Sequence, residues 1–176
     1  MKNLISNKYK DLIVQRHKKT KWGGAVEHKQ KFIKKHADEY SCKSILDYGS
    51  GYGMMKQLMQ EDYPNEYEIH EYEPGVVGKD LDPIACDMTI SFDVLEHIEP
   101  NKIDNVLQHI YDKTNKIAYH NICCIPAQGS FPDGRNFHLL VKKPSWWIKK
   151  FEDKWDIISS SSGAKDKFLR ILLKKK

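Results

Sequence analysis

Three glycines spaced two residues apart follow an apolar run that ends in an aspartate, in the stretch SILDYGSGYG at residues 44–53. The aspartate and the glycines are Asp47, Gly49, Gly51 and Gly53. Glycine in such a turn lets the backbone approach a ligand closely. The carboxylate would repel a pyrophosphate and suits a cationic ligand or an amino group. The spacing matches neither a dinucleotide-binding loop nor a phosphate-binding loop, and a tight strand-to-helix turn without a ligand is the alternative.

Further acidic residues stand where two other apolar segments end. Glu71 lies 22 residues beyond Gly49, where a carboxylate can accept hydrogen bonds from both hydroxyls of a ribose. Asp93 follows the apolar run MTISF, and Glu96 and His97 come in the turn after it. Because parallel strands bring their carboxyl ends to one edge of a sheet, we expect these side chains to lie near the glycines.

A third group of polar residues falls in the segment PDGRNFHL. It contains Asp133, Arg135, Asn136 and His138. Together they could bind a phosphate or carboxylate and hold a base. Arg135 is the only arginine between Arg16 and Arg170. This favours a site that needs the planar, fork-shaped guanidinium group of arginine. The alternative is a structural turn in which Arg135 pairs with Asp133.

Hydrophobic periodicity predicts the elements that position these residues. Helices are expected over residues 25–40, 54–60 and 145–151, and after an N-cap at Asn101. Strands are expected over residues 44–46, 67–74, 87–95, 116–125, 155–161 and 167–175. Strands that alternate with helices predict an α/β fold, a Rossmann-like doubly wound parallel sheet, and the last two strands predict a C-terminal antiparallel hairpin.

The charge is distributed unevenly around a net value of +5. Residues 1–43 carry 12 Lys and Arg against 4 Asp and Glu, residues 44–137 carry 6 against 16, and residues 138–176 carry 11 against 4. An acidic centre suits a cationic ligand, and basic ends are either a solvated surface or a contact for nucleic acid. We expect residues 1–24 to be a basic N-terminal extension and residues 25–176 to form a single domain.

The chain shows no membrane span and no signal peptide, which predicts a cytoplasmic protein. Its four cysteines lack the paired spacing of a zinc site, so reduced thiols and no metal site are predicted.

The segments ILDYGSGYG, EYEP and DMTISFDVLEHIEP, with the closing hairpin, resemble the class I S-adenosylmethionine-dependent methyltransferases. The resemblance spans residues 22–176 and implies the class I methyltransferase fold, with S-adenosylmethionine as the cofactor. It implies that the glycine loop wraps the methionine moiety, that an acid binds the ribose beside an aromatic ring against adenine, and that two residues line the sulfonium. The implied cofactor residues are Asp47, Gly49, Ser50, Gly51, Gly53, Glu71, Tyr72, Asp93 and Val94.

The chain departs from this family after its second expected strand. Only 12 residues separate Pro74 from Asp87, where the family fits a helix and a strand with an adenine-binding acid. We therefore expect the third-strand region to be shortened, with Asp82 as a weak substitute for that acid.

The segment CIPAQGSFPDGRNFHLLVKKPSWW resembles a small phage and bacterial subgroup of these methyltransferases, which share P-D-G-R-N-x-H-L. A phage-encoded member would work in the host cytoplasm. The resemblance places this loop above the cofactor, and His97 or His138 would remove the proton of an alcohol acceptor. The catalytic candidates are His97, His138, Arg135, Asn136 and Asp133.

The methyl acceptor is predicted to be a small polar molecule, namely a sugar, a nucleotide or another phosphorylated metabolite. The Asn/Asp-Pro-Pro-aromatic motif of amino-directed nucleic-acid enzymes and the cysteine next to a proline of cytosine-C5 enzymes are both missing. No inserted domain for a polymer is visible. The alternatives are a nucleic-acid methyltransferase that uses the basic termini and a non-catalytic protein that binds S-adenosylmethionine.

Overall fold

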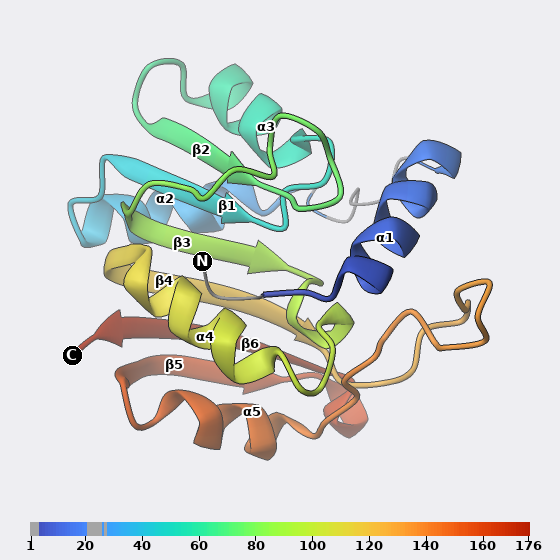
Figure 1. Cartoon of the computed structure of the whole chain (residues 1–176). Helices are drawn as coiled ribbons and strands as arrows, with labels where there is room; N and C mark the ends of the chain where they lie inside the picture. Colours follow the sequence, from blue (N-terminus) through green and yellow to red (C-terminus); the bar gives the residue numbers. More distant parts are fainter. Residues whose placement is uncertain (1–3, 21–25, 27) are drawn as a thin grey trace.

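The computed structural model describes residues 4–20, Val26 and residues 28–176, and within them a mixed sheet carries helices on both faces (Figure 1). The strands are β1 Ser44–Tyr48, β2 Glu68–Tyr72, β3 Cys86–Phe92, β4 Thr114–Cys123, β5 Trp155–Ser162 and β6 Phe168–Lys175. The helices are α1 Asn7–Lys19, α2 Gln30–Glu39, α3 Met54–Asp62, α4 Ile103–Asp112 and α5 Pro144–Phe151, with short 3-10 turns η1 Leu95–His97 and η2 Ala164–Asp166.

The sheet has the order β2-β1-β3-β4-β6-β5. The first four strands in this order are parallel, and β6 runs antiparallel to both β4 and β5. The predicted α/β fold with a C-terminal antiparallel hairpin is therefore confirmed.

Apolar side chains from both layers of helices cover the sheet. On one face, α2 and α3 bury Ile33 and Met55 against strand residues such as Met88. On the other face, α4 and α5 bury Ile110 and Trp147. Alternate residues of a strand point to opposite faces, and the central strand β3 is buried at nearly every position. Met88, Ile90 and Phe92 pack in the core on one face, whereas Thr89 and Ser91 on the other face hydrogen-bond to Thr114 and His120.

The region after β2 contains no strand. Residues 73–85 form turns and bends, and β2 is left at the edge of the sheet. The expectation of a shortened third-strand region is confirmed. Asp82, the expected substitute on the adenine side, bonds instead to His109 at 2.8 Å and Lys113 at 2.6 Å.

Several predicted boundaries were wrong. Helix α2 begins at Gln30 rather than at residue 25, a position that lies outside the described residues, as does the expected domain boundary at residues 24–25. Helix α4 takes Lys102 as its N-cap in place of Asn101, and the Lys102 side chain makes no capping hydrogen bond. Strand β4 is shifted by two residues toward the N-terminus, because Thr114 bonds to Thr89 and pairs with Cys86.

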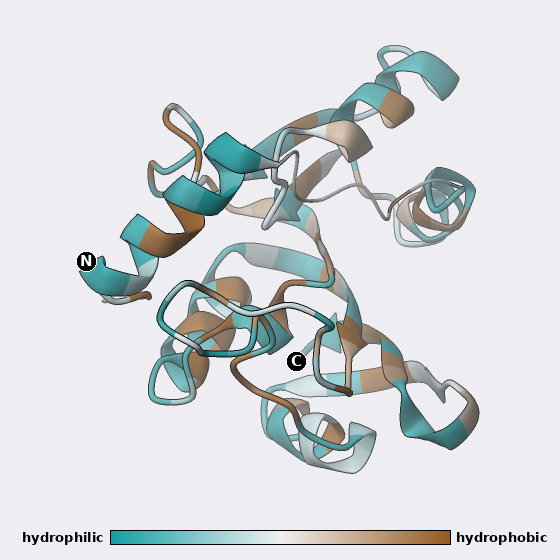
Figure 2. Ribbon diagram, turned by 90° about the vertical axis from the view of Figure 1, so that its right-hand side faces the viewer, coloured by the Kyte–Doolittle hydropathy of each residue, from teal (hydrophilic) through white to brown (hydrophobic). Residues whose placement is uncertain are grey.

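Helix α1 was not predicted, since seven of its residues are Lys, Arg, His or Asp and obscure its apolar positions. The Ser6 hydroxyl accepts a hydrogen bond from the Tyr9 N–H at 3.1 Å and caps the helix. Tyr9 and Ile13, one turn apart, are buried against Phe131. Figure 2 shows the result as a hydrophilic helix interrupted by a hydrophobic band. None of the helices in the described parts of the chain has the length and apolar character needed to cross a bilayer.

Candidate active site

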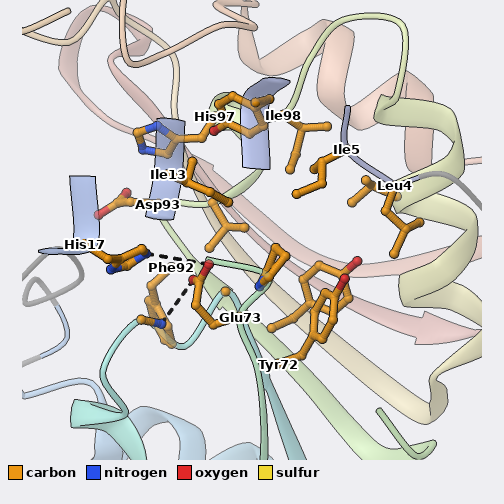
Figure 3. A pocket seen from close by; sticks show the side chains of 17 residues that line it. Leu4, Ile5, Ile13, His17, Tyr72, Glu73, Phe92, Asp93, His97 and Ile98 are labelled. Atoms are coloured by element: carbon orange, nitrogen blue, oxygen red, sulfur yellow. Dashed lines mark hydrogen bonds and ion pairs between the residues drawn. The ribbon is translucent and has the colours of Figure 1, made fainter. Parts of the chain in front are cut away.

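A cavity opens at the carboxyl ends of β1, β2 and β3, and α1 contributes to its lining (Figure 3). Its lining comes from the ends of β1, β2 and β3 with the turns that follow them, from α4, and from α1 with the residues before it. The lining residues are Leu4, Ile5, Tyr9, Ile13, His17, Tyr48, Gly49, Gly51, Tyr72, Glu73, Pro74, Phe92, Asp93, Val94, His97, Ile98 and Val106. The cavity thus occupies the edge of the sheet where ligands of doubly wound folds bind.

The glycine turn is held between β2 and the turn after β3. The N–H of Gly49 donates to the carbonyl of Tyr72 at 2.7 Å. Gly49 has a φ of 83°, and a Cβ there would lie 2.4 Å from a methyl group of Val94. A side chain at this position would therefore strain the backbone and displace Val94 from the cavity wall.

Glu73 points into the cavity from the chain just beyond β2 (Figure 3). Its carboxylate accepts hydrogen bonds from the N–H of Gly75 at 2.9 Å and the N–H of Gly51 at 3.3 Å. His17 of α1 lies 3.6 Å away. Two backbone donors fix the carboxylate at the mouth of the glycine turn, where it can accept hydrogen bonds from a ligand.

Glu71 and Asp47, two of the predicted cofactor residues, are not among the described residues that line the cavity. Glu71 pairs with Lys79 at 2.7 Å and with Lys56 at 3.7 Å. Asp47 is buried beside it in the sheet register, and burial, followed by the charge of Glu71, raises the pKa of Asp47 to about 7.

The other predicted cofactor residues divide between the cavity and the turn beneath it. Ser50 is buried, and Gly53 takes a left-handed φ of 90° at the start of α3. Tyr72, Asp93 and Val94 line the cavity itself.

Asp93 has a φ of 54°, an uncommon backbone conformation for a residue other than glycine. Its carboxylate accepts a hydrogen bond from the Asn121 side chain at 2.8 Å, and its N–H donates to the Asn121 carbonyl at 2.9 Å. Burial raises the pKa of Asp93 above its ordinary value. Such strained turns recur at active sites, where neighbouring contacts hold them.

Two of the catalytic candidates meet at the end of the cavity. The rings of His97 and His138 lie edge to face, with centroids 4.8 Å apart. His97 lines the cavity, and its Nδ1 lies 2.7 Å from the Phe137 carbonyl. Burial, which disfavours the charged ring, lowers the pKa of His97 to about 4. His97 is therefore a weak proton acceptor in this environment.

The remaining catalytic candidates are bonded within their own loop. Arg135 pairs with Asp133 at 2.9 Å and approaches Glu99 at 4.0 Å. The Asn136 side chain donates to the carbonyl of Ala127 at 2.8 Å and accepts from its N–H at 3.0 Å. These contacts match the structural-turn alternative, and Asp133, Arg135 and Asn136 are absent from the described lining of the cavity.

No protein-family model and no curated protein matches the chain. Solved structures do. The 1,6-didemethyltoxoflavin-N1-methyltransferase of Burkholderia thailandensis, with S-adenosylhomocysteine bound, has a TM-score of 0.68 and 13% identity over 96% of this chain and 89% of that chain. Magnesium protoporphyrin IX methyltransferase of Synechocystis PCC 6803, also with S-adenosylhomocysteine, gives a TM-score of 0.56 and 13% identity over 98% of this chain and 88% of that chain.

Human N-acetylserotonin methyltransferase, in complex with S-adenosylmethionine, gives a TM-score of 0.61 and 14% identity over 94% of this chain and 56% of that chain. At such identities the likeness establishes the fold. The chain has the fold of the class I S-adenosylmethionine-dependent methyltransferases.

Two sets of cavity residues escaped the sequence analysis. Glu73 was overlooked because its neighbour Glu71 fits the expected strand end. Leu4, Ile5 and Ile13 were overlooked because they fall in a segment interpreted only as a basic extension. The spacing of Ile5, Tyr9 and Ile13, four residues apart, is the signal that would have predicted a helix with one apolar face.

Proposed function

We propose that this protein is an S-adenosylmethionine-dependent methyltransferase. The observation that carries the proposal is the cavity itself. In a chain with the class I methyltransferase fold, the glycine turn, a fixed carboxylate and the strained turn after β3 converge on one hollow at the carboxyl ends of the strands. Such a set of groups suits a ligand with hydroxyls at one point and a positive charge at another.

In the proposed complex, the methionine moiety lies along the glycine turn, with its sulfonium toward Asp93 and Val94. We assign the ribose to Glu73 rather than Glu71, because the carboxylate of Glu73 faces the cavity and that of Glu71 is paired with lysines. The apolar side chains of Tyr72, Ile5 and Ile98 offer a slot for adenine (Figure 3). Residues before α1 thus replace the missing third-strand region.

The reaction would be a direct displacement. The acceptor attacks the methyl carbon in line with the departing sulfur, the carbon–sulfur bond breaks with its electron pair on sulfur, and S-adenosylhomocysteine is released. Positioning supplies much of the rate in such a reaction. His138, at the cavity end next to His97, is the candidate to accept the proton of an alcohol.

We propose a small polar acceptor, because the sequence lacks the motifs of amino-directed nucleic-acid enzymes and of cytosine-C5 enzymes. We expect this acceptor to be a sugar, a nucleotide or a similar metabolite that enters the cavity beside His97. A non-catalytic protein that binds S-adenosylmethionine is the second candidate, and the paired lysines on Glu71 and the short adenine side favour it.

Titration calorimetry with S-adenosylhomocysteine tests the proposal. We expect binding to the unmodified protein and no measurable binding of NAD. Glu73→Gln should weaken the affinity by about 1–3 kcal/mol, because a ribose hydroxyl loses its charged partner. Glu71→Gln is the matched control and should change the affinity by less than about threefold, roughly 0.7 kcal/mol.

Absence of heat with S-adenosylhomocysteine at millimolar concentration would refute the proposal. Equal losses of affinity in both variants would contradict the assignment of the ribose to Glu73 alone and would make Glu71 a ribose-binding residue again. Incubation with labelled S-adenosylmethionine and pools of sugars, nucleotides and nucleic acids then separates an enzyme from a non-catalytic binder.

A further inference from the structure

Three potential metal ligands converge beside the cavity. Glu96 and His97 come from η1, and His138 comes from the loop that follows β4. One ligand atom from each lies within 4.8 Å of one from each of the others. They come from parts of the chain 41 residues apart, so the fold brings them together and sequence spacing does not.

Both imidazoles are oriented by backbone carbonyls. Nδ1 of His97 lies 2.7 Å from the carbonyl of Phe137, and Nδ1 of His138 lies 2.6 Å from that of Ile125. A carbonyl can only accept, so Nδ1 carries the hydrogen in each ring and the lone pair of the neutral ring is on Nε2. This is the arrangement that orients metal-binding histidines, in which the outer nitrogen bonds to a carbonyl or carboxylate.

The carboxylate of Glu96 is buried with one oxygen satisfied. Its Oε1 accepts a hydrogen bond from the Cys123 N–H at 2.8 Å. In the described part of the chain Oε2 has no hydrogen-bond partner, and the residue is 0% exposed. A buried carboxylate oxygen without a partner costs free energy that a bound cation would recover.

No side chain of Lys or Arg in the described residues forms an ion pair with Glu96 within 4.0 Å. A divalent cation between Glu96 and the histidines would give the buried carboxylate a partner of opposite charge.

We propose that Glu96, His97 and His138 form a binding site for one divalent transition-metal ion. Two imidazoles and one carboxylate on one side of an ion leave its other positions open, and this donor set suits zinc, iron or cobalt better than magnesium. Metal–ligand bonds of about 2.0–2.2 Å require the three groups to close in by side-chain movements on the order of half an ångström to one ångström each. The predicted absence of a metal site considered the cysteines only.

The position of the site suggests what the ion does, and this role depends on the proposed methyl transfer. His97 belongs both to the cluster and to the cavity wall, so an open position on the ion can take an oxygen of the acceptor. Because Nε2 of His138 is then bound to the ion, His138 no longer serves as the base, and the metal-bound hydroxyl releases its proton to water more readily. Its oxygen then attacks the methyl carbon, the carbon–sulfur bond breaks, and a methyl ether and S-adenosylhomocysteine result. The acceptor class is thereby narrowed to molecules with a hydroxyl that can bind a metal.

The test is calorimetry and absorption spectroscopy of chelator-treated protein with Co²⁺ and Zn²⁺, with Mg²⁺ as a comparison. We expect one Co²⁺ or Zn²⁺ per chain at micromolar or tighter affinity, and Mg²⁺ at least tenfold weaker. His138→Gln and Glu96→Gln should each weaken Zn²⁺ binding at least tenfold. Glu96→Gln keeps an acceptor for the Cys123 N–H, so its fold is retained. His70→Gln on β2 is the matched control and should bind as the unmodified protein does.

Titration of the same samples with S-adenosylhomocysteine separates this proposal from the proposed function. Cofactor binding without Zn²⁺ or Co²⁺ binding at 1 mM overturns the metal site and leaves the proposed function standing, whereas the opposite result overturns the proposed function alone. Stoichiometric binding that both variants retain, or a cobalt spectrum with thiolate charge transfer, overturns the site because the ion then lies elsewhere. Loss of Zn²⁺ binding in both variants, with normal folding by circular dichroism, supports the proposed metal site.

Discussion

Asp47 is a buried carboxylate beneath the proposed ligand site. It is buried at the end of β1, next to the register position of Glu71, and its pKa is raised to about 7. The folded protein therefore holds a proton there over a pH range in which the unfolded chain, with a pKa of 3.8, has lost it. Folding stability should fall as the pH rises from about 4 to about 7 and then level off.

Asp47→Asn should remove this dependence, because the amide does not titrate. We expect the variant without ligand to be more stable than the unmodified protein at pH 8, by on the order of a few kcal/mol, and nearly equal to it at pH 4. Chemical denaturation at several pH values measures this difference. Asp62→Asn, at the exposed end of α3, is the control. A variant that is less stable than the unmodified protein at pH 8 would contradict the expectation.

The same residue should respond to the cofactor. If the ammonium group of the methionine moiety lies near Asp47, its charge favours the ionised carboxylate. The affinity for S-adenosylhomocysteine should then rise from pH 5.5 to pH 8 in the unmodified protein and stay flatter in Asp47→Asn. Calorimetry at these pH values is the measurement. Parallel pH profiles for the two proteins would show that Asp47 does not interact with the charge of the ligand.

Among the elements, β1, β3 and the closing hairpin were predicted from sequence because their apolar patterns and turn residues agree with their burial. The glycine turn was predicted because the glycines fall directly after an apolar strand. Which of two nearby acids faces the cavity was not predictable. Glu71 and Glu73 share a strand alternation, and it is the N–H groups of Gly51 and Gly75 that draw Glu73 inward.

The histidine cluster escaped prediction for a similar reason. His97 and His138 were proposed separately as bases, and only the path of the loop after β4 places their rings edge to face. That path depends on Asn136, whose side chain ties residues 127, 129 and 138 together. Contacts of this kind between distant segments leave no periodic signal in a sequence.

Helix α1 is the element whose removal should affect the cavity most. Ile13→Asp places a charge against the buried contact with Phe131 and should detach the helix. We expect trypsin to cleave after Arg16 or Lys18 at least tenfold faster, and affinity for S-adenosylhomocysteine to fall on the order of tenfold, about 1.4 kcal/mol. Gln15→Asp, on the exposed side of the helix, is the control. Unchanged cofactor affinity with a detached helix would show that α1 is dispensable for binding.

The loop that carries Arg135 gives a prediction about the acceptor. Arg135 is partly exposed and pairs with the carboxylates of Asp133 and Glu99, and a lysine keeps the positive charge, so Arg135→Lys should change folding stability by less than about 1 kcal/mol. Affinity for S-adenosylhomocysteine should stay within about threefold. Methyl transfer to the acceptor should fall about a hundredfold or more if the planar fork binds it. Normal single-turnover transfer would establish that the Asp133–Arg135 pair is a structural turn.

On the scale of the whole molecule, the two basic ends lie on opposite sides. Helix α1 borders the cavity at the carboxyl ends of the parallel strands, whereas the chain ends at their amino edge, as the labels in Figure 1 show. At that edge Lys175 donates to the carbonyls of Tyr111 and Thr114, at 2.9 and 2.6 Å. Among the described residues, α1 and these C-terminal lysines therefore do not form one continuous track that leads to the site.

A nucleic-acid substrate would need such a track, since phosphate contacts by several Lys and Arg residues supply most non-specific affinity and make it fall steeply with salt. Fluorescence anisotropy with labelled 20-nucleotide RNA and duplex DNA measures this. We expect dissociation constants weaker than about 10 µM at 150 mM salt. Lys18→Glu, on the exposed side of α1, should change any residual binding by less than about threefold. Submicromolar binding at 150 mM salt that Lys18→Glu weakens more than about tenfold would instead place a nucleic acid against α1 and the cavity, and would overturn the small-molecule acceptor.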